Sequence, residues 1–142
     1  MQTQLHFKLK AIHIHHGLSP YADDWLNFCK EKCKLLDIDF DAVKVKINEK
    51  GSLGIEGEAR ELRYEAIKKK QKGVVALGHH QNDQAETLLL QLLRGSGLKG
   101  LAGMPEFDEK RKFWRPMLNI KKELLEKYAS ENDIKYIKDE SN

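Results

Sequence analysis

Hydrophobic and polar residues alternate along two segments of the chain, which is the pattern of a half-buried β-strand. Residues 8–16 read KLKAIHIHH, with isoleucines on one face and histidines on the other. Residues 40–47, FDAVKVKI, alternate in the same way. Successive side chains of a strand point to opposite faces. The pattern therefore predicts a strand in each segment.

Four longer segments carry apolar residues at helical spacing. Intervals of three and four residues return to one face of an α-helix. The helices predicted in this way are 21–36, 55–70, 82–94 and 120–131. Two short segments add strands: the apolar run GVVALG at 73–78, which suits a strand buried on both faces, and IKYIK at 134–138.

Strands that alternate with helices predict an α/β fold with a mainly parallel sheet. Right-handed crossovers place helices on both faces, so the sheet is expected to be doubly wound. The glycine-rich residues 95–105 and the segment up to Leu118 are expected to be irregular. Because no repeat, linker or low-complexity boundary interrupts the pattern, we expect one domain over residues 1–142.

Composition narrows the class of protein. The 142 residues are 40% hydrophobic and 33% charged, as in ordinary globular proteins. No apolar run approaches the roughly 20 residues of a membrane span, and the start lacks a signal peptide, so we expect a cytoplasmic protein without membrane contact. Cys29 and Cys33 lie one helical turn apart, a poor fit to disulfide geometry, which predicts reduced thiols. The net charge of +3 permits a nucleic-acid partner without requiring one.

The most chemically dense stretch is GHHQNDQAET at 78–87, directly after the predicted strand 73–78. In open parallel sheets, ligands bind beyond the carboxyl ends of the strands. At about 100° per residue, one face of the following helix is apolar and is expected to be core, while the opposite face is mainly polar. The apolar face holds Ala85, Leu88, Leu89 and Leu92; the opposite face holds Asp83, Glu86, Thr87, Leu90 and Arg94.

A purely structural interpretation of this stretch remains open. Asp83 and Glu86 have the spacing of a capping box, and acidic side chains favour a helix N-terminus. One of the two preceding histidines could reach Asp83 at the i, i+4 spacing. Residue pattern alone does not decide between a helix cap and a ligand site.

Three sharper-looking motifs favour structural interpretations. GSGLKG at 95–100 matches a dinucleotide-binding string, but it follows a helix instead of a strand, so Gly95 is better explained as a helix C-cap. The HIHH segment and the C-x-x-x-C pair do not have the spacing of a zinc site. The KKKQK run at 68–72 ends a helix, where cations complement the dipole. Because the histidines and cysteines lack metal-ligand spacing, we expect no metal site.

Several motifs, taken together, resemble the catalytic domain of bacterial tRNA(Ile)-lysidine synthetase. They are IHIHHGLSPYADDW, GIEGEARELRY, LGHHQNDQAETLLLQLLRGSGLKGLAGM, RPML and DESN, in the order and at about the spacing of that family. The resemblance runs over nearly the whole chain. It implies a partial PP-loop ATPase domain with an adenine-nucleotide α-hydrolase-like, Rossmann-like fold.

The resemblance also implies a reaction. ATP adenylates the carbonyl oxygen at carbon 2 of the wobble cytidine in an isoleucine tRNA with a CAU anticodon, and pyrophosphate leaves. The ε-amine of L-lysine then attacks that carbon and expels AMP. The implied partners are thus ATP, L-lysine and tRNA(Ile), and Mg²⁺ is expected from ATP chemistry.

The family pattern H-x-x-x-D-x-x-E falls on three residues of this chain. The resemblance implies that His79 contacts the nucleotide or the developing charge, and that Asp83 and Glu86 hold the lysine amine, one of them as base. Five more residues are candidates for substrate or nucleotide contacts: Arg60, Arg63, Arg94, His15 and His16. The alternative for each arginine is a surface ion pair with a glutamate, and for the two histidines a core or supporting role.

The sequence departs from the family in one important respect. It contains no S-G-G-x-D-S loop, the element that holds ATP's pyrophosphate, and it opens on the family's second strand, so the fold is expected to be incomplete at the N-terminus. We expect the 142 residues to be inactive alone, with exposed sheet edges through which copies could pair. Two other functions remain open: a non-catalytic oligomerising or binding remnant, and a tRNA-thiolating enzyme of the same superfamily.

Overall fold

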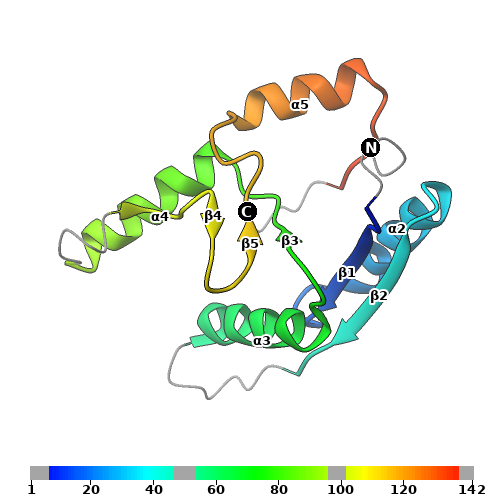
Figure 1. The fold of residues 1–142 in the computed structure, drawn as a ribbon, viewed down its shortest axis with the longest axis horizontal. Helices are drawn as coiled ribbons and strands as arrows, with labels where there is room; N and C mark the ends of the chain where they lie inside the picture. The colour runs from blue at the N-terminus through cyan, green and yellow to red at the C-terminus, as the bar shows by residue number, and fades with distance from the viewer. Residues whose placement is uncertain (1–6, 47–53, 96–101, 138–142) are drawn as a thin grey trace. The chain divides into compact units, whose positions relative to one another are not determined.

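The computed structural model describes residues 7–46, 54–95 and 102–137. The chain forms two compact units, Met1–Gln71 and Lys72–Asn142. Figure 1 labels the elements of both units, and each unit is described here by itself.

The first unit is a parallel β-α-β arrangement followed by a long helix. Its elements are β1 (Lys10–His15), α2 (Ala22–Leu35), β2 (Asp39–Lys44) and α3 (Gly54–Lys70). β1 and β2 pair in parallel, from Lys10 opposite Asp39 to His15 opposite Lys44. A parallel pair requires a crossover, and α2 provides it. The strands predicted at 8–16 and 40–47 and the helices predicted at 21–36 and 55–70 are confirmed.

Local chemistry explains where α2 begins and ends. Asp23 and Asp24 lie in its first turn, and Lys32 and Lys34 in its last, so both ends complement the helix dipole. Past its last turn, Asp37 has a φ of 51°, a left-handed conformation that turns the chain toward β2.

The second unit is a small mixed sheet with two helices. Its elements are β3 (Val75–Ala76), α4 (Gln81–Leu93), β4 (Phe107–Asp108), β5 (Phe113–Trp114) and α5 (Lys122–Glu131). The sheet order is β3-β5-β4; β5 is parallel to β3 and antiparallel to β4. The predicted helices 82–94 and 120–131 are thus confirmed, with boundaries shifted by one or two residues. The end of α4 is also as predicted, because Gly95 has a φ of +67° and donates to the carbonyl of Leu92.

The segment expected to be irregular contains a β-hairpin. The Asp108 carboxylate accepts the backbone N–H of Arg111 at 2.9 Å, and Lys112 takes a left-handed φ of 56°. An aspartate that accepts a backbone N–H in this way is a turn former. The backbone N–H of Arg111 lowers the pKa of Asp108. The expectation of irregular structure up to residue 118 was therefore wrong for the hairpin at 107–114.

Two strand predictions need correction. The run 73–78 forms only the two-residue strand β3, and Val74 is 58% exposed, so this strand is not buried on both faces. Within the described part of the chain, only β5 pairs with β3, and a strand with one neighbour gains little cover. Residues 134–137 pair with no described strand, and their large apolar side chains are exposed, so the predicted final strand is not formed there; residue 138 lies outside the described residues.

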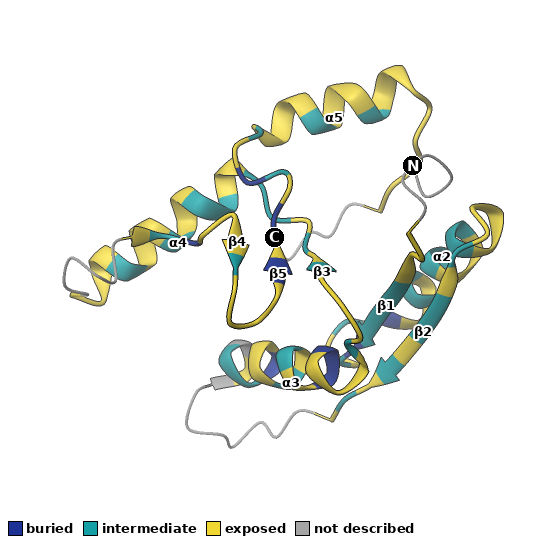
Figure 2. Ribbon diagram, in the orientation of Figure 1, coloured by how far each residue is buried: buried dark blue, intermediate teal, exposed yellow. Residues whose placement is uncertain are grey.

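The buried side chains are few and lie mainly on α3 and around the hairpin. In the first unit they include Ala59, Ala66 and Ile67 of α3; in the second they include Met104, Phe113 and Leu118. Figure 2 shows these as short dark segments in a ribbon that is otherwise intermediate or exposed.

The leucine face of α4 was predicted to be core and is exposed. Leu88, Leu89 and Leu92 are 38%, 59% and 52% exposed, and no residue of α4 is buried. Periodicity correctly identifies an apolar stripe, but it contains no information about what covers that stripe. The described residues of this chain do not bury it (Figure 2).

Among the described helices, none is both long and apolar enough to cross a membrane. The expectation of a single domain stays a prediction.

Candidate functional site

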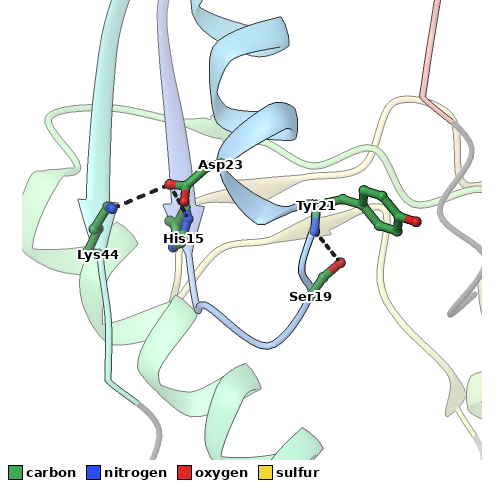
Figure 3. Close-up of polar contacts among 5 residues, drawn as sticks. All are labelled: His15, Ser19, Tyr21, Asp23 and Lys44. Atoms are coloured by element: carbon green, nitrogen blue, oxygen red, sulfur yellow. Dashed lines mark hydrogen bonds and ion pairs between the residues drawn. The ribbon is translucent and has the colours of Figure 1, made fainter.

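At the carboxyl end of β1, a buried histidine contacts an aspartate from α2. His15 is 8% exposed, and its Nε2 donates to Oδ1 of Asp23 at 3.1 Å. Lys44, the residue opposite His15 on β2, reaches the same oxygen at 3.4 Å. Figure 3 shows the Asp23 carboxylate between the two side chains. One carboxylate therefore connects β1, β2 and the first turn of α2.

Charged neighbours affect the titration of Asp23. The charge and hydrogen bond of Lys44 hold the pKa of the exposed Asp23 carboxyl below its usual range, with a smaller contribution from His15. Just before Asp23, the Ser19 hydroxyl oxygen accepts the backbone N–H of Tyr21 at 3.1 Å and shapes the turn into α2 (Figure 3).

On β1 itself, burial lowers the pKa of His13, and so does the nearby His15, whose ring centroid is 6.5 Å away.

The next residue, His16, faces an arginine of α3. Arg63 Nη2 donates to His16 Nε2 at 3.4 Å, a bond that requires a neutral imidazole at Nε2. Burial lowers the pKa of His16, and the charge of Arg63 lowers it further. A neutral His16 leaves the exposed guanidinium with donors available for an anionic group.

The second candidate arginine of α3 lies one turn earlier. Arg60 is exposed, and its Cζ lies 5.5 Å from the centre of the Tyr64 ring, a cation–π contact at the i, i+4 spacing. The surface ion pairs considered for Arg60 and Arg63 do not occur among the described residues. Both guanidinium groups thus keep charge that no described carboxylate neutralises.

In the second unit, α4 begins with a capping box, but not the one that the spacing predicted. The N-cap is His80: its backbone N–H donates to Asp83 Oδ2 at 2.7 Å, and Asp83 N–H donates back to His80 Nδ1 at 3.4 Å. The predicted box from Asp83 to Glu86 is therefore shifted by three residues. The histidine that contacts Asp83 is His80, at i, i+3 and outside the helix, because residue 80 is extended with a φ of −125°.

The remaining predicted residues of this helix spread along it. His79 is half-buried directly before the N-cap, and Glu86 is exposed one turn into the helix. Arg94 is exposed at the C-cap. Eleven residues at 1.5 Å each place it about 16 Å beyond Asp83 along the axis. The structure therefore brings His79, Asp83 and Glu86 to one end of α4 and leaves Arg94 at the other.

Sequence reasoning missed several residues around these sites. Asp23 was identified only as part of a helix start, and Lys44 only as a strand residue, because their contact depends on strand register. His80 was not identified as the histidine that contacts Asp83. Arg115, 4% exposed in the RPML motif, donates from Nη1 to the Pro105 carbonyl at 2.7 Å. The RPML motif includes this arginine, but the motif alone does not show that the side chain is buried or what it contacts.

The group at the end of β1 and the group at the start of α4 carry side chains of opposite charge. Among the residues that the structure describes, no three His, Cys, Asp or Glu side chains gather in a way that would bind a metal ion. The first-unit group offers guanidinium donors, while Asp83 and Glu86 offer carboxylates beside a helix N-terminus.

Known proteins match this chain over nearly its whole length. A sequence model described as the PP-loop domain matches residues 1–142. The tRNA(Ile)-lysidine synthase of Neisseria meningitidis serogroup B is 47% identical over 135 residues, which cover 93% of this chain and 32% of that relative. The proteins of the same name from Chromobacterium violaceum and Actinobacillus pleuropneumoniae serotype 3 are 44% and 46% identical, over 94% and 99% of this chain.

The chain spans about a third of the length of these curated relatives. Its parallel strand pairs and alternating helices agree with an incomplete Rossmann-like α/β fold. Because the match extends over all 142 residues, this chain belongs to the PP-loop domain family.

Proposed function

We propose that this chain is part of a tRNA(Ile)-lysidine synthetase, an ATP-dependent ligase that forms a carbon–nitrogen bond. The observation that carries the proposal is the identity of 44–47% to relatives of that name, spread over 93–99% of the chain. The matched region, which covers 93–99% of the chain, spans both groups of candidate residues, those at the end of β1 and those at the start of α4.

The proposed reaction has two steps. The cytidine carbonyl oxygen attacks the α-phosphorus of ATP, and pyrophosphate leaves. The ε-amine of L-lysine then attacks carbon 2, the bond to the AMP oxygen breaks, and the amine loses a proton. Such a site needs cationic groups for phosphate and carboxylates for the ammonium.

The start of α4 has the residue types that an amine requires. We propose that Asp83 and Glu86 bind the lysine ε-amine. His79 is proposed to contact the nucleotide or the developing charge. Asp83 already accepts the N–H of His80, which fixes its carboxylate at the helix end. Glu86 is exposed one turn later, so the two carboxylates lie at i, i+3 on neighbouring turns.

The end of β1 and the facing part of α3 have the residue types that phosphate requires. We assign phosphate or carboxylate contacts to Arg60 and Arg63, which no described carboxylate neutralises. His16 is hydrogen-bonded to Arg63 and is kept as a candidate for substrate contacts. His15 is hydrogen-bonded to Asp23, so we assign it a supporting role. Arg94 is the weakest candidate, because it lies at the opposite end of α4 from Asp83.

Magnesium enters the proposal only as the counter-ion of ATP's phosphates. The described residues do not assemble a set of three ligands for it, so no step is assigned to the metal. The proposed partners are ATP, L-lysine and the CAU-anticodon tRNA(Ile), in the cytoplasm. Among the described strands, β1 and β3 each have one unpaired edge, which would allow two copies to associate.

We further propose that the 142 residues do not catalyse the reaction alone. They correspond to about a third of the relatives' length and contain no S-G-G sequence. A non-catalytic binding remnant is the alternative that this feature favours. A thiolating enzyme is less well supported, because burial raises the pKa of both Cys29 and Cys33, the opposite of what a reactive thiolate needs.

The test is incorporation of labelled lysine into the CAU-anticodon tRNA in the presence of ATP. The complete gene product that contains this chain should transfer label, and the 142 residues alone should not. Transfer by the 142 residues alone would overturn the inactive-fragment proposal. Absence of transfer by the complete product would reject the lysidine assignment and favour the remnant.

A further inference from the structure

One side-chain amide joins α4 to a segment twenty residues later in the chain. Gln84 Oε1 accepts the backbone N–H of Met104 at 2.7 Å, and Gln84 Nε2 donates to the Met104 carbonyl at 2.8 Å. Met104 is 9% exposed. The amide therefore satisfies both backbone polar groups of a residue that is largely shielded from water, and losing it would leave them without partners.

The neighbouring residue, Gly103, packs closely against the same amide. Gly103 has a φ of +67°, and a Cβ added to it would lie 3.0 Å from both Cδ and Oε1 of Gln84. These distances are shorter than ordinary van der Waals contact. Only glycine combines this backbone conformation with such a close approach to Gln84.

The same segment is attached on its other side to the end of β5. Arg115 Nη1 donates to the Pro105 carbonyl at 2.7 Å, and its backbone N–H donates to the Glu106 carbonyl at 2.8 Å. Arg115 is 4% exposed and forms no ion pair among the described residues. Residues 103–106 are thus held between α4 and β5.

A second connection reaches the first turn of α4. Gln81 N–H donates to the Ile120 carbonyl at 2.9 Å, and the Asn82 side-chain oxygen accepts the Lys122 N–H at 3.2 Å. Residues 81, 82 and 84 therefore contact other segments, while Asp83 between them caps the helix. This leaves little freedom for the turn that carries Asp83 to rotate or slide.

We propose that Gln84 is a positioning residue, which with Gly103 and Arg115 clamps residues 103–106 to α4 and thereby fixes Asp83 and Glu86 for the lysine amine. The inference rests on the proposed function. A displacement near 1 Å in a reacting site can cost on the order of a hundredfold in rate. Loss of the clamp therefore lowers turnover more than it weakens binding of ATP.

The test uses the complete gene product and two matched glutamine variants. Gln84→Leu removes both hydrogen bonds with a side chain of similar size. Gln91→Leu, in the same helix, is the control, because the buried Gln91 side-chain oxygen has no hydrogen-bond partner among the described residues. The two readouts are hydrogen exchange at the Met104 amide and the kinetics of lysine incorporation.

In Gln84→Leu, the hydrogen-exchange rate of the Met104 amide should be at least about tenfold higher than in the unmodified protein. The variant should also lower kcat for lysine incorporation by about tenfold or more while changing KM for ATP by less than about threefold. Gln91→Leu should change neither readout. Unchanged exchange in Gln84→Leu would overturn the clamp, and faster exchange with normal kcat would reduce it to a purely structural contact.

A second pair of variants keeps the clamp testable if Gln84→Leu does not fold. Gly103→Ala should lower the thermal midpoint more in the unmodified protein than in a Gln84→Ala background, where the crowding atoms are absent. Equal shifts in both backgrounds would contradict the clamp. An unmodified protein that incorporates no lysine would instead reject the proposed function, and the exchange rate at Met104 separates the two failures.

Discussion

The backbone N–H of His80 donates to the carboxylate of Asp83 at 2.7 Å, so the residue proposed to hold the lysine amine also caps the helix that carries it. Cap and ligand site are therefore not competing explanations for Asp83. Its position at the helix end is fixed by the bond, and its charge remains available to a cation.

Substitution of Asp83 separates these two roles. Asp83→Asn keeps an oxygen that can accept the His80 N–H, so the free energy of unfolding should change by less than about 1 kcal/mol, whereas Asp83→Ala should lose about 0.5–2 kcal/mol. Both variants should lose lysine incorporation, because neither has the charge. Chemical denaturation and the incorporation assay check this, and normal incorporation by Asp83→Asn would leave the residue as a cap only.

Asp23 should make the protein more sensitive to acid. Its pKa is below the usual 3.8 in the folded state, so the unfolded state binds more protons in acid. The stability contributed by the charged carboxylate is present above pH 3.8 and is lost as pH falls through the lower folded value. Asp23→Asn should flatten this part of the stability profile. Asp24→Asn, an exposed neighbour in the same helical turn, is the control, and an identical profile for both variants would contradict the contact with Lys44.

His16 predicts a second pH dependence, in a higher range. Its pKa is below the usual 6.5, so the folded state favours the neutral ring. The unfolded state takes up a proton first as pH falls, and stability should decrease from pH 6.5 downward until the lower folded value is passed. His16→Gln retains an acceptor for Arg63 but does not titrate. A denaturation series at several pH values should show a smaller slope for this variant; an unchanged slope would argue against burial of His16.

The stability of the chain should depend on α3 more than on the leucines of α4. Ile67 is 6% exposed, whereas Leu93 is 85% exposed. Ile67→Ala should cost about 2–5 kcal/mol, and Leu93→Ala should change the free energy of unfolding by less than about 0.5 kcal/mol. Urea denaturation of the two variants measures the difference. Comparable losses would mean that Leu93 is covered in solution.

The sequence predicted those parts of the fold that depend on neighbouring residues. The alternation at 8–16 and 40–47 specified β1 and β2, and Gly95 specified the end of α4, because each depends on neighbouring residues. The hairpin at 107–114 was missed because its two-residue strands are too short for a periodic signal.

The candidate site shows the same limit. The motifs identified Asp83, His16 and Arg63 as separate candidates. They did not show that His16 contacts Arg63 or that His15 contacts Asp23, because these contacts depend on how α3 and α2 pack against β1. They also did not identify His80 as the N-cap that bonds to Asp83, because that bond depends on the extended backbone of residue 80. The clamp between Gln84 and Met104 joins residues twenty positions apart. Helical periodicity also could not reveal that the leucine stripe of α4 is exposed, since burial depends on a neighbour that the pattern does not contain.

The most direct test of the proposed function is the nucleoside composition of the CAU-anticodon tRNA after reaction. The tRNA is incubated with ATP, L-lysine and the complete gene product, digested to nucleosides and analysed by mass spectrometry. We expect a cytidine that carries lysine at carbon 2, dependent on ATP and absent with Asp83→Asn. Unmodified cytidine in the reaction with the unmodified protein would contradict it.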